Sequence, residues 1–173
     1  MKKRNFTYQL VVMAFLISLE IILTRFLSIN MPIVRIGFGF LPVAVTAIMF
    51  GPLWSAACYA VGDVLGMLIF PSGAYFPGFT LSAFITGAIY GLIFYRKDVT
   101  FKRAFVAAAL ILVSITLGLN TYWLHIIMGK GFWAILPTRI LNGVIMLVVQ
   151  TVTIPVVWNK VISRLPHMKE NTL

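Results

Sequence analysis

The sequence predicts an all-α integral membrane protein: a bundle of six transmembrane helices with both termini in the cytoplasm. Three observations predict this fold class. The chain is 61% hydrophobic and only 10% charged, a balance that would leave large apolar patches on a water-soluble domain. Its apolar runs are continuous, which favours helices over the alternating strands of a membrane barrel. Ten of its fourteen Lys and Arg residues fall in three short clusters that flank these runs.

The apolar runs divide a single membrane domain, residues 1–173, into six expected spans. The second span is short, and the Gly51-Pro52 turn signal separates it from the third. A Pro- and Gly-rich loop at 71–78 precedes the fourth span, and a charged loop at 96–103 precedes the fifth. The expected spans cover approximately residues 8–29, 36–50, 53–70, 79–95, 104–124 and 133–158.

The basic clusters give the bundle an orientation. They lie at residues 2–4, 96–103 and 160–169. With six spans, all three clusters fall on one side of the bilayer, which is the cytoplasmic side by the positive-inside rule. With five spans they would fall on opposite sides, so the charge pattern favours six. The net charge of +10 is therefore attributed to topology in a lipid bilayer and not to nucleic-acid binding, and we expect a multi-pass protein of a prokaryotic plasma membrane.

The chain lacks the residue patterns of an enzyme. No two of its four carboxylates have metal-ligand spacing, and its two histidines are expected on opposite sides of the membrane. Gly129-Lys130 lacks the upstream glycine and the following Ser or Thr of a phosphate-binding loop. We therefore expect no catalytic residue, no metal and no cofactor, and any ATP hydrolysis would belong to partner subunits.

Four basic residues remain that orientation does not explain, and all lie in or near the expected outer segments: Arg25, Arg35, Lys130 and Arg139. A cation inside a span costs about 2.5–3.5 kcal/mol on insertion scales and usually has a partner. Arg25 either reaches the outer headgroups, pairs with Glu20 or Asp63, or binds a ligand. Arg35 and Arg139 together would form a cationic mouth suited to carboxylates.

Aromatic rings and amides occupy the same outer level as these cations. They are either an interfacial belt or the walls of a binding site. Asp63 is either a structural partner of a cation or an acceptor for ligand N–H groups, while a structural role is favoured for Glu20. Rings, amides and cations at one depth suggest an aromatic, polar-edged anion as ligand. The candidate substrate-binding residues are Arg25, Arg35, Asp63, Tyr75, Phe76, Phe79, Asn120, Trp123, Arg139 and Asn142.

Small residues recur four positions apart, a spacing that lets helix backbones approach closely in membranes. Gly62 and Gly66, and likewise Gly87 and Gly91, are such pairs. On the first span the pair at Ala14 and Ser18 either packs internally or forms a surface for another membrane protein.

Six segments of the chain carry a resemblance to a known family: 35–42, Gly51-Pro52, Gly62-Asp63, 75–83, 119–124 and 137–139. They resemble the S components of energy-coupling factor (ECF) vitamin transporters, and among these the folate-specific ones. The resemblance covers nearly the whole chain, and the loop before the fourth span and the Asn-Thr-Tyr-Trp segment are its more specific parts. The Ala14/Ser18 pair stands where the family often has two alanines.

The resemblance implies a substrate-binding subunit that captures its vitamin outside the cell. It implies association with a membrane-embedded coupling subunit and two ATPase subunits, and bodily reorientation in the membrane to release the vitamin inside. The pterin ring of folate would stack on Phe76, Phe79 or Trp123. Its edge would meet Asn120, Asn142 or Asp63, and its two tail carboxylates would meet Arg35 or Arg139. Open alternatives are another vitamin, such as riboflavin or pantothenate, a small membrane enzyme, or a purely structural helix bundle.

Overall fold

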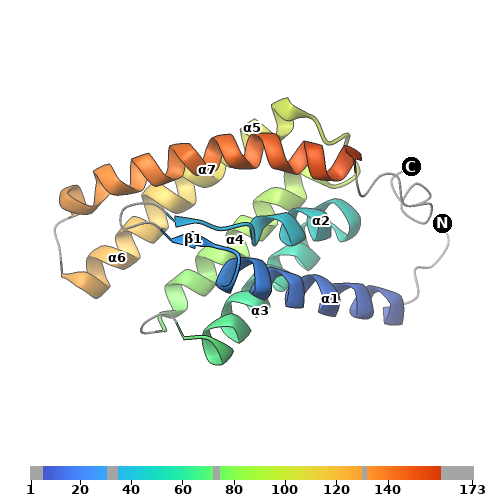
Figure 1. The fold of residues 1–173 in the computed structure, drawn as a ribbon, viewed down its shortest axis with the longest axis horizontal. Helices are drawn as coiled ribbons and strands as arrows, with labels where there is room; N and C mark the ends of the chain where they lie inside the picture. Colours follow the sequence, from blue (N-terminus) through green and yellow to red (C-terminus); the bar gives the residue numbers. More distant parts are fainter. Residues whose placement is uncertain (1–5, 31–34, 72–74, 130–131, 161–173) are drawn as a thin grey trace.

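The computed structural model describes residues 6–30, 35–71, 75–129 and 132–160. The protein is built almost entirely from helices, with one two-stranded ribbon (Figure 1). The elements are α1 (Phe6–Arg25), β1 (Ile29–Asn30), β2 (Arg35–Ile36), α2 (Phe40–Phe50), α3 (Pro52–Ile69), α4 (Pro77–Phe94), α5 (Phe101–Leu110), the π-helix η1 (Ile111–Asn120), α6 (Thr121–Met128) and α7 (Phe132–Lys160).

The expected bundle of six helical segments is present. Five stretches in the described part of the chain are long and apolar enough to cross a membrane: α1, α3, α4, the continuous run Phe101–Met128, and α7. The sixth, α2, has 11 residues, so it is about 16 Å long and shorter than a hydrocarbon core of about 30 Å. Nine of its residues are buried, because α1, α3, α4 and α7 pack around it.

Two of the expected boundaries are wrong in the same region. The first span was expected to reach residue 29, but α1 ends at Arg25, and the second was expected from residue 36, but α2 begins at Phe40. Between them β1 and β2 pair antiparallel, with Ile29 opposite Ile36. This pairing provides hydrogen bonds for backbone groups that a helix would otherwise pair internally. A short apolar run fits either a strand or a helix, so the sequence pattern did not distinguish them.

The fifth expected span is also different in kind. It is continuous from Phe101 to Met128, but its central ten residues, η1, are π-helical. Thr121 marks the altered register, because its hydroxyl donates to the carbonyl oxygen of Thr116, five residues earlier, at 2.9 Å. The hydrophobic pattern shows which residues are apolar but not which backbone groups pair. It therefore did not predict the π-helical stretch η1.

Close backbone packing joins α3 to α4, as the glycine spacing predicted. Gly87 faces the backbone of Ser55 and Ala56, and Gly91 faces the backbone of Pro52. The Ser55 hydroxyl also donates to the Gly87 carbonyl oxygen at 2.7 Å. A Cβ at either glycine would overlap this neighbouring backbone, so α3 and α4 can approach this closely only because these residues are glycine.

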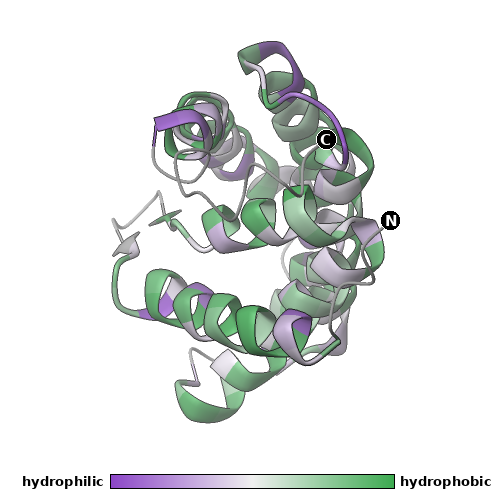
Figure 2. Cartoon of the chain, turned by 90° about the vertical axis from the view of Figure 1, so that its right-hand side faces the viewer, coloured by the Kyte–Doolittle hydropathy of each residue, from purple (hydrophilic) through white to green (hydrophobic). Residues whose placement is uncertain are grey.

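The bundle has two distinct ends. Figure 1 shows that α1 begins and α7 ends at the same end, while the β1–β2 ribbon, α6 and the start of α4 lie toward the other. Hydrophobic residues make up much of the helices, and hydrophilic ones gather chiefly where helices end (Figure 2). This is the distribution that a bilayer solvent favours.

Candidate ligand-binding site

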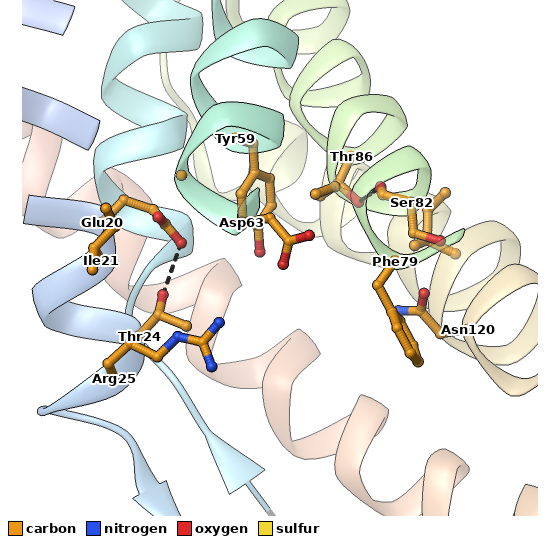
Figure 3. Close-up of a pocket in the computed structure, with 13 residues that line it drawn as sticks. Glu20, Ile21, Thr24, Arg25, Tyr59, Asp63, Phe79, Ser82, Thr86 and Asn120 are labelled. Atoms are coloured by element: carbon orange, nitrogen blue, oxygen red, sulfur yellow. Dashed lines mark hydrogen bonds between the residues drawn. The ribbon is translucent and has the colours of Figure 1, made fainter. Parts of the chain in front are cut away.

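A cavity of about 180 Å³ lies between α1, α3, α4 and η1 (Figure 3). It brings together four of the ten predicted site residues: Arg25, Asp63, Phe79 and Asn120. The complete lining is Glu20, Ile21, Thr24, Arg25, Tyr59, Gly62, Asp63, Phe79, Ser82, Ala83, Thr86, Ile115 and Asn120.

The α1 wall carries a buried carboxylate. Glu20 is 2% exposed, and its Oε1 accepts a hydrogen bond from the Thr24 hydroxyl at 2.9 Å. Its Oε2 has no hydrogen-bond partner in the described part of the chain. The carboxylate fits against α3 because Gly62 has no Cβ there to collide with Oε2. One turn along α3, Gly66 leaves similar room for the Arg25 guanidinium, whose Nε would be 3.2 Å from an added Cβ.

These contacts revise the role expected for the Gly62/Gly66 pair. The spacing predicted close approach of two backbones, but both glycines instead face polar side chains of α1. The contact between α1 and α3 therefore accommodates the Glu20 carboxylate and the Arg25 guanidinium at the edge of the cavity.

Asp63 connects the cavity to the loop before α4. Its Oδ2 accepts a hydrogen bond from the Thr80 hydroxyl at 2.7 Å, and Thr80 Oγ1 lies 3.1 Å from the Tyr75 hydroxyl. Tyr75 itself is 52% exposed and is absent from the lining, so it reaches the cavity only through Thr80 and Asp63. One oxygen of Asp63 is therefore held by the protein while the residue faces the cavity.

An aromatic cluster borders the cavity on the α4 and α6 side. The ring centroid of Phe76 lies 6.2 Å from that of Phe79 and 5.5 Å from that of Trp123. The Trp123 indole also donates from Nε1 to Ser82 Oγ at 3.1 Å. Of the three rings only Phe79 lines the cavity, so Phe76 and Trp123 support its edge.

Asn120 closes the cavity from η1. In Figure 3 it lies across the space from Glu20, with Tyr59 and Asp63 between them. Its Oδ1 is buried and, within the described residues, has no hydrogen-bond partner. An unsatisfied buried polar group costs about 1–3 kcal/mol, so two such oxygens lining one cavity indicate a place that a polar ligand would complete.

Arg139 and Asn142 are not among the lining residues. Both residues are on α7 and partly buried. Arg35 is in β2, which packs against α7, but its side chain is outside the described part of the structure. The cationic mouth of Arg35 and Arg139 therefore stays a prediction.

Sequence reasoning missed several lining residues that a simple signal marks. Thr24 follows Glu20 by four positions, Asp63 follows Tyr59 by four, and Thr86 follows Ser82 by four. Residues at this spacing share a helix face, so three apolar helices each present a polar pair to the same space. Searching the expected spans for such polar pairs would have placed Glu20 in the site.

The described residues hold no group of three or more His, Cys, Asp or Glu side chains placed to bind a metal ion. The chemistry available in the cavity is instead that of recognition: a cation, two carboxylates, hydroxyls, an amide and an aromatic ring.

A family model, described as the substrate-specific component of ECF transporters, matches residues 8–158. The chain belongs to this family. It is 49% identical over 170 residues to a protein of Clostridium novyi named Folate transporter FolT, an alignment that covers 98% of this chain and 96% of that protein. It is 34% identical over 150 residues to the Folate transporter FolT of Leuconostoc mesenteroides, covering 83% and 80% of the two chains.

The fold of this S component is also similar to a solved structure described as FolT bound with folic acid. The TM-score is 0.82 at 36% sequence identity, and the alignment covers 89% of this chain and 94% of that one. The family is a transporter component and not an enzyme family.

Proposed function

We propose that this S component binds folate on the outer side of a prokaryotic plasma membrane and delivers it inward through a coupling subunit driven by two ATPase subunits. The observation that carries the proposal is the likeness, over nearly the whole chain, to a structure described as bound with folic acid. The cavity supports it, because its ring, cation and hydrogen-bonding groups suit an aromatic, polar-edged anion.

Within the cavity, Phe79 is the ring best placed to stack on a pterin, with Phe76 and Trp123 behind it. Asn120 and Asp63 offer hydrogen-bonding groups to the pterin edge. Arg25 contributes positive charge at the α1 wall, and Arg35 and Arg139 remain our choice for the two carboxylates of the glutamate tail. Tyr75 acts by holding Thr80, and Asn142 adds a polar group on α7.

The partner surface that we propose is the Ala14/Ser18 face of α1. Both residues are exposed, and the Ser18 hydroxyl donates to the Ala14 carbonyl oxygen at 2.9 Å. Because that hydroxyl is satisfied within its own helix, Ser18 packs as a small residue much as alanine would. A coupling subunit could therefore approach α1 closely along this face.

The orientation that we propose places both termini and the 96–103 loop in the cytoplasm. The common end of α1 and α7 in Figure 1 is consistent with this arrangement. The cavity then lies toward the outer end of the bundle, where a substrate from outside would enter.

Uptake of labelled folic acid tests the proposal. Proteoliposomes are prepared with this chain, its coupling subunit and the ATPase subunits. They should accumulate folic acid only when ATP is present on the same side of the membrane as the ATPase subunits. Riboflavin and pantothenate in excess should not compete. No accumulation of folic acid, together with ATP-dependent accumulation of labelled riboflavin or pantothenate by the same proteoliposomes, would favour the alternative substrate instead.

A further inference from the structure

Glu20 is the most deeply buried charged side chain among the described residues that line the cavity, at 2% exposure. Its Oε1 is fixed by Thr24 at 2.9 Å, while its Oε2 has no hydrogen-bond partner within that part of the chain. An ionised carboxylate can only accept hydrogen bonds, so the open position calls for a donor. The cavity beside it is where a donor could come from.

The packing around Glu20 holds its side chain in place without satisfying it. An added Cβ at Gly62 would meet Oε2, and one at Gly39 would meet the Thr24 hydroxyl that donates to Oε1, so the two glycines make room for this hydrogen-bonded pair. Neither contact supplies a donor to Oε2. A residue kept only for packing would not need two glycines and a threonine arranged around its charged group.

The neighbouring polar groups leave Glu20 with a distinct task. Asp63 resembles Glu20 in having one oxygen held, since its Oδ2 accepts from Thr80 at 2.7 Å, but Asp63 is only partly buried. Asn120 has an open Oδ1, but an amide can turn to present either a donor or an acceptor. Glu20 is thus the group in the cavity that combines deep burial, a fixed position and a strict demand for a donor.

The charge of Glu20 also selects which end of folate it can face. The glutamate tail carries two carboxylates, which Glu20 and Asp63 would repel. The pterin ring has two adjacent donors, its 2-amino group and N3–H, on one edge. A carboxylate accepting from that edge would form charge-assisted hydrogen bonds, which are stronger than neutral ones.

We infer that Glu20 is a specificity-determining residue whose carboxylate accepts hydrogen bonds from the 2-amino and N3–H edge of the pterin ring. The inference rests on the proposed folate function and deepens it. It places the pterin end against α1 and leaves the tail to Arg35 and Arg139. It also moves the main acceptor role from Asp63 to Glu20.

The test measures discrimination between two ligands by the wild-type chain and by Glu20→Gln, purified in detergent. The ligands are folic acid and its 2-desamino-2-methyl analogue, in which a methyl group replaces the amino group. The wild type should prefer folic acid by at least about tenfold, the size expected for a hydrogen bond to a charged group. Glu20→Gln should bind folic acid about tenfold more weakly and lose most of the preference. Asp98→Asn, a carboxylate change in the 96–103 loop, is the matched control and should change neither value.

The outcomes separate the inference from the function on which it rests. If the wild type does not bind folic acid, the proposed function fails and the inference falls with it. If the wild type binds and a folded Glu20→Gln keeps the same preference, only the inference is overturned. Glu20→Asp provides the second variant, because it retracts the carboxylate while keeping its charge. It should reduce the preference, and an unchanged preference in this variant also overturns the inference.

Discussion

The indole Nε1 of Trp123 donates a hydrogen bond to Ser82 Oγ at 3.1 Å, joining two residues that are 41 positions apart in the chain. Ser82 is on α4 and lines the cavity, and Trp123 is on α6. Phe76 packs on the same indole, and Gly78 makes room for both rings, since an added Cβ would lie 2.7 Å from Trp123 Cδ2. This contact joins α6 to the α4 wall of the site.

Trp123→Phe should therefore weaken folate binding without unfolding the protein. The substitution keeps a ring against Phe76 but removes the donor to Ser82, and a hydrogen bond contributes about 0.5–1.5 kcal/mol, or about two- to tenfold in affinity. Equilibrium dialysis with labelled folic acid measures the change. Trp133→Phe is the control, because Trp133 is 80% exposed. Equal losses in both variants would contradict a role for the Trp123–Ser82 contact.

Two glycines of similar burial should respond differently to alanine. At Gly62 the new methyl group would meet the Glu20 carboxylate, the end of a flexible side chain, whereas at Gly91 it would meet the backbone of Pro52. Gly62→Ala should thus displace Glu20 and weaken folate binding with little change in unfolding temperature. Gly91→Ala should lower the unfolding temperature, since overpacking costs about 1–3 kcal/mol. Thermal unfolding in detergent and folate affinity are measured on both variants. A lower unfolding temperature in Gly62→Ala, with weaker folate binding but unchanged unfolding in Gly91→Ala, would contradict these roles of the two glycines.

The charge of Arg25 should matter for ligand affinity. Its guanidinium lines the cavity beside Gly66, where a dianionic ligand would benefit from a nearby cation. Arg25→Gln should weaken folate binding by about tenfold or more, as for one charge-assisted hydrogen bond. Arg103→Gln is the matched control, because Arg103 donates to the Asp98 carbonyl oxygen in a loop remote from the cavity. A folded Arg25→Gln with unchanged affinity would remove Arg25 from the site.

A bulky residue on the exposed α1 face should separate binding from assembly. Ala14→Leu adds volume where we propose that the coupling subunit approaches, and leaves the cavity untouched. Folate affinity of the isolated chain should stay the same, while co-purification with the coupling subunit should fall sharply. Val113→Leu, at a 66% exposed position on η1, controls for a bulky lipid-facing change. Normal assembly of Ala14→Leu would place the interface elsewhere.

Much of the fold could be predicted because lipid imposes simple rules. Continuous apolar runs gave the helical segments, the Gly51-Pro52 turn separated α2 from α3, and Gly87 and Gly91 predicted a close helix contact. The β1–β2 ribbon and the π-helical register of η1 were missed, since both depend on which backbone groups pair, and apolar patterning does not report that.

The candidate site was predicted only in part for a similar reason. Arg25, Asp63, Phe79 and Asn120 line one cavity, and that they bind a ligand there stays a prediction. Glu20 was assigned a structural role because a lone acid in an apolar span usually has one. Its true surroundings depend on Gly62 of another helix, which no spacing within α1 could reveal.

The central claim is that this S component binds folate in the cavity between α1, α3, α4 and η1. Titrating folic acid into the purified chain, while following its tryptophan fluorescence, tests it most directly, because Trp123 contacts a cavity-lining residue. We expect tight, saturable quenching by folic acid, strongly reduced in Trp123→Phe, and no saturable quenching by riboflavin at matched absorbance or by pantothenate at matched concentration. No saturable response to folic acid from a folded sample, or an equal response to the other vitamins, would contradict it.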